Sequence, residues 1–292
     1  MDVVIIFNGL GNQMSQYAFY HQKKQIDKAT YFVPFCNDHN GLELDTVFNV
    51  NTKETFIQKS LYILFRILLT DRIKMVSIPL KRLLKLLNCK IVRESFNYNY
   101  NPDFLQPSKG ITFYYGGWHT EKYFAAEREK IKSVFDFKKP LGNCNDEYID
   151  QIASTNSVSL HVRRGDFMNE ANIGLFGGVA TKAYFEEAIK LIATKVNNPH
   201  FFVFSNDMDW VKENLSMDTV THVTCNSGKD SWKDMKLMSL CKHNIIPNST
   251  FSWWGAWLNN NKDKIVISPF RFLNNDNYTD VYPDSWTKIS DY

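Results

Sequence analysis

Short apolar segments alternate with amphipathic ones along the second half of the chain. The apolar segments, rich in β-branched and aromatic residues, lie at Val158–Val162, Phe201–Ser205, Val220–Thr224, Asn244–Pro247 and Ile265–Ser268. The segments between them repeat their apolar residues at helical spacing, over Lys182–Val196, Met208–Leu215, Trp232–Lys242 and Phe251–Asn259. Because strands that alternate with helices are typical of βαβ units, we predict a parallel sheet covered by helices on both faces.

The first half of the chain is less regular. Its pattern indicates a strand at Val3–Phe7, a tight loop over Asn8–Asn12, a helix over Gln13–Ile26, an apolar segment at Tyr31–Pro34, a basic helical pattern over Phe56–Leu87, a strand at Ile111–Tyr115 and a helix over Glu121–Phe135. The segment Lys138–Asp146 contains Lys-Lys-Pro-Leu-Gly-Asn, which is typical of a linker. We therefore expect two domains, residues 1–140 and 141–292.

Composition and charge narrow the class of protein. The 292 residues are 44% apolar and 22% charged, as in an ordinary globular protein. A net charge of +3, from 34 basic and 31 acidic residues, is too weak for the surface of a nucleic-acid binder. Aromatic residues reach 15%. Most of them are expected in the core, and the rest suit the flat surfaces of sugars or bases.

The cysteines and the start of the chain predict a cytoplasmic protein. The five cysteines are an odd number without Cys-x-x-Cys spacing, so neither a disulfide framework nor a zinc site is expected. The first residues show no signal-peptide pattern, and no segment approaches the ~18 apolar residues of a membrane span. The basic stretch Lys59–Lys90 leaves two alternatives, a peripheral contact with the inner membrane or a solvated helix face.

Polar side chains gather where the strands predicted in the second half end. The first strand leads into His161–Asp166, the second ends at Ser205–Asp207, and the fourth leads into Asn248–Ser252. Ligands of open parallel sheets bind beyond the carboxyl ends of the strands. Three polar ends along one edge therefore predict a binding site there.

The residue types at this edge predict an anionic ligand. The planar fork of an arginine matches two phosphate oxygens and stays charged, so Arg163 and Arg164 suit a diphosphate leaving group. The alternative is a surface network in which either arginine pairs with Asp166. Hydroxyls and free N–H groups at the helix start after Asn248 form an anion-binding arrangement, with ordinary N-capping by Ser249 or Thr250 as the alternative.

Two further motifs bear on cofactors. Asp207-Met208-Asp209 matches the Asp-x-Asp pattern that holds a divalent ion on nucleotide sugars, but these positions also suit a helix cap and first turn. Because nearby arginines could neutralise the diphosphate, we expect no metal ion. The segment Asn8–Met14 looks like a dinucleotide-binding loop, yet Met14 stands where a third small residue belongs, so NAD binding is not expected.

Together these motifs resemble the bacterial α-1,2-fucosyltransferases of glycosyltransferase family 11. The matching pieces, in family order, are Gly-Leu-Gly-Asn-Gln-Met at Gly9–Met14, Glu-Lys-Tyr-Phe at Glu121–Phe124, His-Val-Arg-Arg-Gly-Asp at His161–Asp166, Phe-Ser-Asn-Asp at Phe204–Asp207, and the block from Asp234 to Leu258 with its Asn-Ser-Thr-Phe-Ser-Trp-Trp-Gly-Ala-Trp-Leu. They span nearly the whole chain.

The resemblance implies an α/β fold of GT-B type, with two Rossmann-like domains facing a cleft. GDP-fucose would lie on the C-terminal domain and the acceptor on the other. The implied reaction is an inverting, metal-free transfer of L-fucose from GDP-β-L-fucose to the 2-hydroxyl of a galactoside in an O-antigen, a capsule or a lipid-linked glycan at the inner face of the plasma membrane. The alternatives are another GDP-fucose transferase, such as an α-1,6 type, a nucleotide-dependent oxidoreductase, and a non-catalytic sugar-binding module.

The resemblance also implies roles for individual residues. Arg163 would grip the β-phosphate, His161 would contact the nucleotide, and Asp234 would pair with the guanine edge. Further donor contacts are expected from Arg164, Asn206, Ser249, Thr250, Phe251 and Ser252, and acceptor-side contacts from Asn12, Gln13, Trp118 and Glu121. The chain departs from the family pattern at Phe167, where many members carry a tyrosine, and at Gly-Gly-Trp-His-Thr before Glu121, where an aromatic-Gln-Ser pattern is commoner.

The residues leave two candidates for the catalytic base. Asp166 stays ionised beside two arginines, which makes it a weak proton acceptor. Glu170, in the same loop, is the alternative.

Overall fold

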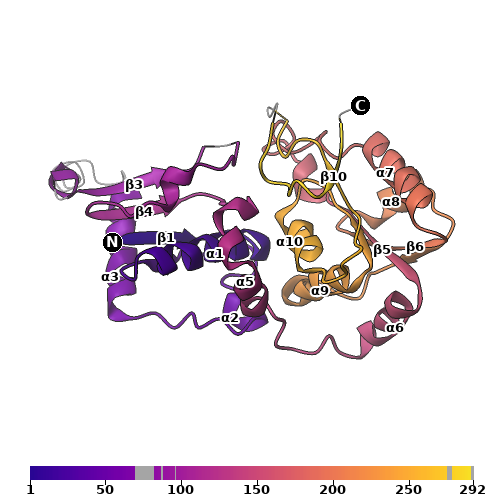
Figure 1. The fold of residues 1–292 in the computed structure, drawn as a ribbon, viewed down its shortest axis with the longest axis horizontal. Coiled ribbons are helices and arrows are strands. Elements are labelled where there is room, and N and C mark those ends of the chain that lie inside the picture. Colours follow the sequence, from indigo (N-terminus) through magenta and orange to yellow (C-terminus); the bar gives the residue numbers. More distant parts are fainter. Residues whose placement is uncertain (70–81, 87, 96, 275–277, 291–292) are drawn as a thin grey trace. The chain divides into compact units, whose positions relative to one another are not determined.

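The computed structural model describes residues 1–69, 82–86, 88–95, 97–274 and 278–290, and the chain divides into two compact units, Met1–Lys138 and Lys139–Tyr292 (Figure 1). Each unit is built on its own parallel sheet. The parallel architecture predicted for the second half is confirmed there, and it extends to the less regular first half.

The first unit is a four-stranded sheet in the order β2-β1-β4-β3. Its strands are β1 (Asp2–Ile6), β2 (Tyr31–Pro34), β3 (Cys89–Arg93) and β4 (Ile111–Tyr115). Helix α3 (Phe56–Leu69) packs on one face through Leu61 and Phe65, which meet Val3 and Ile5 of β1. Helix α1 (Leu10–Ile26) lies on the other face, where its Phe19 contacts the ring of Tyr114. The shorter helices are α2 (Leu44–Val47) and α5 (Arg128–Val134).

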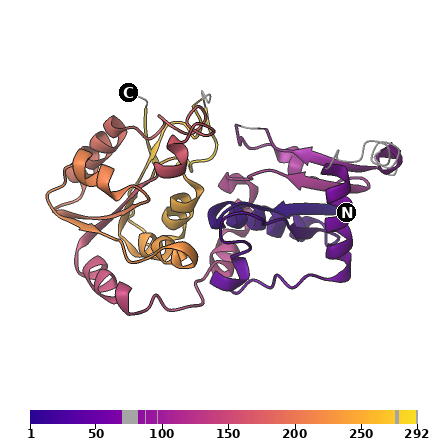
Figure 2. The ribbon, with the colours of Figure 1, turned by 180° about the vertical axis from the view of Figure 1, so that it is seen from behind.

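The second unit is a six-stranded sheet in the order β10-β9-β8-β5-β6-β7. Its strands are β5 (Asn156–Val162), β6 (Pro199–Ser205), β7 (Val220–His222), β8 (His243–Ile245), β9 (Val266–Pro269) and β10 (Thr287–Ile289). Helices α7 (Lys182–Lys195) and α8 (Met208–Asn214) cover one face, and α6 (Asp146–Ser154), α9 (Trp232–Leu240) and α10 (Thr250–Leu258) lie on the other (Figure 1, and from behind in Figure 2).

Several sequence-based expectations are corrected. The loop expected over Asn8–Asn12 is largely the first turn of α1, because the amide of Asn12 already donates to the carbonyl of Gly9. The single helix expected over Glu121–Phe135 is two 3₁₀ turns followed by α5, since Phe124 leaves helical geometry with φ −135°. Elements β3, α6 and β10 were not predicted. The helical pattern over Phe56–Leu87 is confirmed over Phe56–Leu69 and over residues 82–86, and residues 70–81 and 87 lie outside the described residues.

The expectation of no disulfide is also wrong. Cys144 and Cys225 form one, although they are 81 positions apart. Spacing rules that look for close pairs could not find it, because only the fold brings the start of α6 beside the segment after β7. Among the described helices, none is both long enough and apolar enough to cross a membrane.

Candidate functional site

The carboxyl ends of β5, β6 and β8 lie next to one another in the second sheet. In the parallel register Val162 faces Ser205, so the residues that follow the two strands, Arg163 and Asn206, leave the sheet side by side. Strand β8 pairs with β5 from the other side and leads through Asn248 into α10. The polar ends predicted to converge are therefore at one edge.

Arg163 and Asp166 form a bidentate ion pair. Arg163 Nε lies 2.7 Å from Asp166 Oδ1, and Nη2 lies 2.9 Å from Oδ2. The network considered as an alternative to phosphate binding is thus present in the structure. It is compatible with a phosphate role, because the pair fixes the plane of the guanidinium and uses only two of its nitrogens. Nη1 donates to no residue within the described part of the chain.

Arg164 and Asn206 join the ends of β5 and β6. Arg164 Nε lies 3.1 Å from Asp207 Oδ2, and its guanidinium lies 4.2 Å from the centre of the Trp210 ring. Asn206 Oδ1 accepts from the backbone amides of Arg164 at 3.0 Å and Gly165 at 3.3 Å. A Cβ at Gly165 would lie 2.5 Å from Asn206 Nδ2, which explains the glycine at this turn.

Asp207, the first residue of the Asp-x-Asp motif, caps a helix. Its Oδ1 accepts from the amide of Trp210 at 3.3 Å while its Oδ2 pairs with Arg164. This is the capping role weighed against metal binding. Among the described residues, no group of three or more His, Cys, Asp or Glu side chains is placed to hold a metal ion.

His161 is the penultimate residue of strand β5 and is almost fully buried beneath this edge. It is 5% exposed and its ring lies 6.0 Å from that of Phe251. Burial, helped by the positive charge of Arg163, lowers the pKa of His161 to about 3, so the imidazole is neutral at physiological pH. Within the described residues its Nδ1 has no hydrogen-bond partner. A buried polar atom of this kind is typical of a group that meets a ligand.

The first turn of α10 supplies backbone donors. Ser249 is the N-cap, but its side chain makes no capping bond and its own amide donates to the Pro247 carbonyl at 2.8 Å. The amides of residues 250–252 donate to no described residue, so they are available to an anion at the positive end of the helix. The hydroxyl of Ser252 is fully buried and donates to the Ser249 carbonyl at 3.4 Å, which leaves its amide as the group that could contact a donor.

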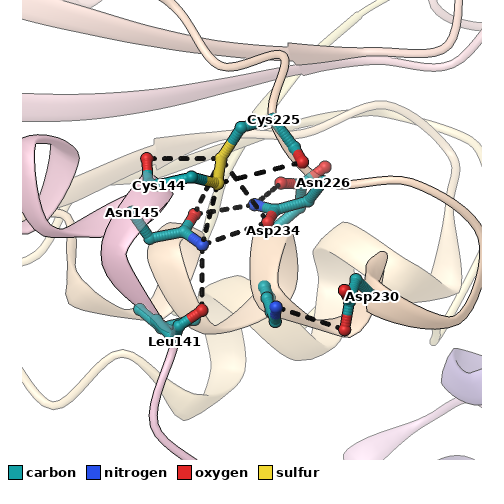
Figure 3. Close-up of a disulfide and its surroundings, with 8 residues drawn as sticks. Leu141, Cys144, Asn145, Cys225, Asn226, Asp230 and Asp234 are labelled. Atoms are coloured by element: carbon teal, nitrogen blue, oxygen red, sulfur yellow. Dashed lines mark hydrogen bonds and ion pairs between the residues drawn. A yellow bond between two sulfur atoms is a disulfide. The ribbon is translucent and has the colours of Figure 1, made fainter.

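Asp234 lies in the first turn of α9, half-buried, and its Oδ1 accepts a hydrogen bond from Asn226 Nδ2 at 2.7 Å (Figure 3). Burial raises the pKa of Asp234 to about 7, although the hydrogen bond from Asn226 acts in the opposite direction. The carboxylate can accept further hydrogen bonds, because each of its oxygens carries two lone pairs. Asn226 was not singled out from the sequence, since no motif marks a lone asparagine.

A cavity of about 330 Å³ opens beside the two arginines. Its apolar wall includes Trp210 and the stacked rings of Phe167 and Phe176, whose centres are 5.0 Å apart. The volume is in the range of small-molecule sites. Phe167 therefore contributes an apolar surface to this cavity.

In the first unit, the structure limits what the predicted acceptor residues can contact. Gln13 is fully buried, donates both N–H groups of its side chain to the carbonyls of Asn8 and Gly41, and accepts from the amide of Glu43. Asn12 lies half-buried in the first turn of α1. Gln13 therefore shapes the turn after β1, and Asn12 is the residue of this motif with an accessible side chain.

Trp118 corrects an expectation. Its ring is fully buried, stacks on Phe19 with ring centres 4.3 Å apart, and makes a T-shaped contact with Tyr123. A sugar could not reach this ring without repacking of the core. Glu121 lies half-buried in a 3₁₀ turn, with its Oε2 2.6 Å from Arg128 Nη1. Trp118 therefore belongs to the core of the first unit, and the acceptor-side role of Glu121 stays a prediction.

Glu94 was missed by sequence reasoning. It follows β3, and its Oε2 accepts from the amides of Gly117 at 2.7 Å and Trp118 at 2.8 Å, which holds the turn after β4. Burial raises the pKa of Glu94 to about 7, against the lowering by these two amides. Sequence reasoning gave no signal for Glu94, because β3 carries a lysine and an arginine and was not predicted as a strand.

The two candidate bases differ in setting. Both carboxylate oxygens of Asp166 are held by Arg163, which limits its use as a proton acceptor. Glu170 is exposed in the loop after the 3₁₀ turn Gly165–Met168, and the structure brings it into no ion pair with another described residue.

Comparison with known proteins identifies the family. The model of glycosyl transferase family 11 matches residues 3–290. The chain belongs to this family. Over 308 aligned residues it is 32% identical to an alpha-1,2-colitosyltransferase of Escherichia coli, covering 99% of each chain. It is also 30% identical over 145 residues to galactoside alpha-(1,2)-fucosyltransferase 1 of Saimiri boliviensis boliviensis, covering 47% of this chain and 40% of that protein.

Among solved structures, a mutant of Arabidopsis thaliana FUT1 in complex with GDP has a TM-score of 0.51 at 13% identity, over 95% of this chain and 72% of that one. This likeness is one of fold, and it agrees with the α/β fold of GT-B type expected from the motifs. The family 11 protein is therefore a glycosyltransferase with two Rossmann-like units.

Proposed function

We propose that this family 11 protein transfers a 6-deoxyhexose, L-fucose, from GDP-β-L-fucose to the 2-hydroxyl of a galactoside and forms an α-1,2 linkage. The linkage is supported by the names of both relatives above, which specify 1,2 transfer. A guanine nucleotide is supported by the GDP in the Arabidopsis structure and by the carboxylate of Asp234 at the carboxyl edge of the sheet. The acceptor we propose is an O-antigen, a capsule or a lipid-linked glycan, assembled at the cytoplasmic face of the membrane.

The observation that carries this proposal is the grouping of a guanidinium fork, a free helix start and an unpartnered imidazole at one sheet edge. Arg163 and the amides of residues 250–252 would bind the diphosphate, and neutral His161 would offer a ring nitrogen to the nucleotide. The apolar wall of Phe167 and Phe176 suits the 6-methyl group of a deoxysugar. These groups supply the positive charge that the leaving group needs, so we propose that the reaction requires no metal ion.

The chemical step follows from this placement. The acceptor 2-hydroxyl attacks C1 of the sugar from the face opposite GDP, the C1–O bond breaks, and GDP leaves with the electron pair while the hydroxyl proton passes to a base. Negative charge grows on the departing phosphate oxygen, where Arg163 and the α10 amides would stabilise it. Preorganised donors of this kind are worth roughly 3–4 kcal/mol, or about 10²–10³ in rate.

Colitose is the second candidate donor sugar, because the full-length relative is a colitosyltransferase. Colitose lacks the 3-hydroxyl of fucose but shares the 6-methyl group. Incubation of the purified protein with GDP-fucose or GDP-colitose, a panel of β-galactosides and either EDTA or buffer tests both donors. We expect an α-1,2-linked fucoside that forms equally in EDTA, with the linkage read by NMR. Transfer from GDP-colitose alone would replace the donor, and transfer from neither would refute the proposal.

The base is tested in the same assay. Because Asp166 is committed to Arg163, we propose Glu170 as the proton acceptor. Glu170→Gln is expected to lose the alkaline plateau of the pH–rate profile, and Asp166→Asn is expected to lower the rate at all pH values by loosening Arg163. Full activity in both variants would exclude both residues as the base.

A further inference from the structure

The disulfide joins two segments that carry the same dipeptide. Cys144 precedes Asn145 just before α6, and Cys225 precedes Asn226 in the segment after β7. The Cα atoms of the two cysteines are 6.4 Å apart, so each asparagine is held next to the other by the neighbouring covalent link (Figure 3).

The two asparagine side chains form a reciprocal amide pair. Asn145 Nδ2 donates to Asn226 Oδ1 at 3.1 Å, and Asn226 Nδ2 donates to Asn145 Oδ1 at 2.8 Å. Asn145 is fully buried, and its Nδ2 also donates to the Leu141 carbonyl at 3.1 Å. These bonds fix which end of each amide is the nitrogen.

This pairing fixes the orientation in which the Asn226 amide faces the carboxylate of Asp234. The second N–H of Asn226 Nδ2 donates to Asp234 Oδ1 at 2.7 Å. If the Asn226 amide were flipped, its oxygen would face the carboxylate oxygen, and both bonds to Asn145 would be lost. The disulfide and Asn145 therefore hold a donor against one side of the carboxylate and leave its remaining lone pairs for a ligand.

We propose that Asn226 is a positioning residue for the nucleobase of the donor, and that the Cys144–Cys225 disulfide holds it in place, so that opening the disulfide weakens binding of a guanine nucleotide. This inference rests on the proposed function, in which Asp234 accepts from guanine N1–H and its exocyclic amine. A dithiol reductant opens the link: the disulfide takes two electrons and two protons and becomes two thiols, while the dithiol becomes a cyclic disulfide. The two segments are then joined by non-covalent contacts alone.

Calorimetry of the full chain with GDP, inosine diphosphate and pyrophosphate tests the proposal. Inosine lacks the exocyclic amine and pyrophosphate lacks the base, so the three ligands separate base recognition from phosphate binding. In the oxidised protein we expect GDP to bind more tightly than inosine diphosphate. We expect Asn226→Ala to weaken GDP about tenfold, as one hydrogen bond to a charged group predicts, and to leave pyrophosphate unchanged. The GDP preference over inosine diphosphate should shrink, which a merely structural role would not cause.

The pH profile and the redox state give two independent readouts. Because the Asn226 hydrogen bond lowers the pKa of Asp234, its removal should move the midpoint of GDP binding to higher pH. Dithiothreitol should weaken GDP binding in the wild type and in the control Cys36→Ser, and have no effect on Cys144→Ser/Cys225→Ser, which should already match the reduced wild type. If Asn226→Ala does not fold, Asn145→Ala removes the partner without touching Asp234.

The outcomes separate the two proposals. If the wild type binds GDP with a base preference that neither Asn226→Ala, Asn145→Ala nor reduction alters, this inference is overturned and the proposed function stands. If the oxidised wild type binds pyrophosphate but shows no preference for GDP, the guanine assignment fails and this inference falls with it.

Discussion

Removal of the Arg163 side chain should slow transfer strongly while the protein stays folded. The ion pair with Asp166 lies at the surface, where Arg163 is 31% and Asp166 40% exposed. Pairs of this kind contribute about 0–1 kcal/mol to stability, so Arg163→Ala should barely move the urea midpoint. The same side chain is expected to contribute roughly 3–4 kcal/mol to the transition state, so the rate should fall about 10²–10³-fold.

Two measurements test this prediction: kcat for transfer from GDP-fucose to a β-galactoside acceptor, and the urea midpoint of unfolding followed by tryptophan fluorescence. Arg163→Lys keeps the charge but loses the planar fork, and we expect an intermediate rate because only one phosphate oxygen can be met at a time. Arg66→Ala is the control, since Arg66 is an exposed arginine on α3 of the first unit. A kcat of Arg163→Ala within threefold of the control would refute the argument about the leaving group.

Three further predictions follow from other residues. GDP binding, measured relative to pyrophosphate binding, should weaken about tenfold per pH unit below about 7, because burial raises the pKa of Asp234 to about 7 and the ionised carboxylate is the acceptor. The Asp234→Asn variant should bind GDP more weakly and without this pH dependence. A wild-type binding profile that is flat from pH 6 to 8 would contradict the prediction. The Gly165→Ala variant should have a kcat about 5–30-fold lower, because the new Cβ would displace Asn206 from two backbone hydrogen bonds worth about 1 kcal/mol each. The control variant Gly174→Ala, whose Cβ would lie in open space, should keep the wild-type rate. Reduction of the disulfide should lower the free energy of unfolding of the second unit by about 4–5 kcal/mol, the chain-entropy value for a loop of this length, and an unchanged urea midpoint in dithiothreitol would show that the link adds no stability.

The local pattern of apolar and polar residues was enough to predict most helices of the second unit. The helices over α7, α8 and α9 begin where they were expected, and α10 begins one residue earlier, because a run of apolar residues at helical spacing between two apolar strands has few other ways to be buried. The polar residues at the ends of these strands could then be grouped at one edge, since parallel strands all end on the same side. The ion pair of Arg163 with Asp166 was foreseen as an alternative because the two residues are three positions apart.

What could not be predicted depends on residues distant in the chain. Strand β3 is short and carries a lysine and an arginine, so only its pairing with β4 makes it a strand, and Glu94 became visible with it. Trp118 looked available for a sugar, but Phe19 of another element covers its ring. The helix expected after Glu121 is interrupted because the aromatic core of the first unit holds Phe124 in a non-helical conformation.

The sequence by itself determined the family, the α/β class and the chemical character of the donor edge, because motifs, periodicity and strand ends are local properties of the chain. The tertiary structure alone decided that Cys144 meets Cys225, that Asn226 donates to Asp234, and that His161 is buried and neutral. The disulfide joins positions 81 apart, the Asn226–Asp234 hydrogen bond joins a loop to the helix after it, and the neutral state of His161 depends on exclusion of water. All three are set by how the sheet and its helices pack.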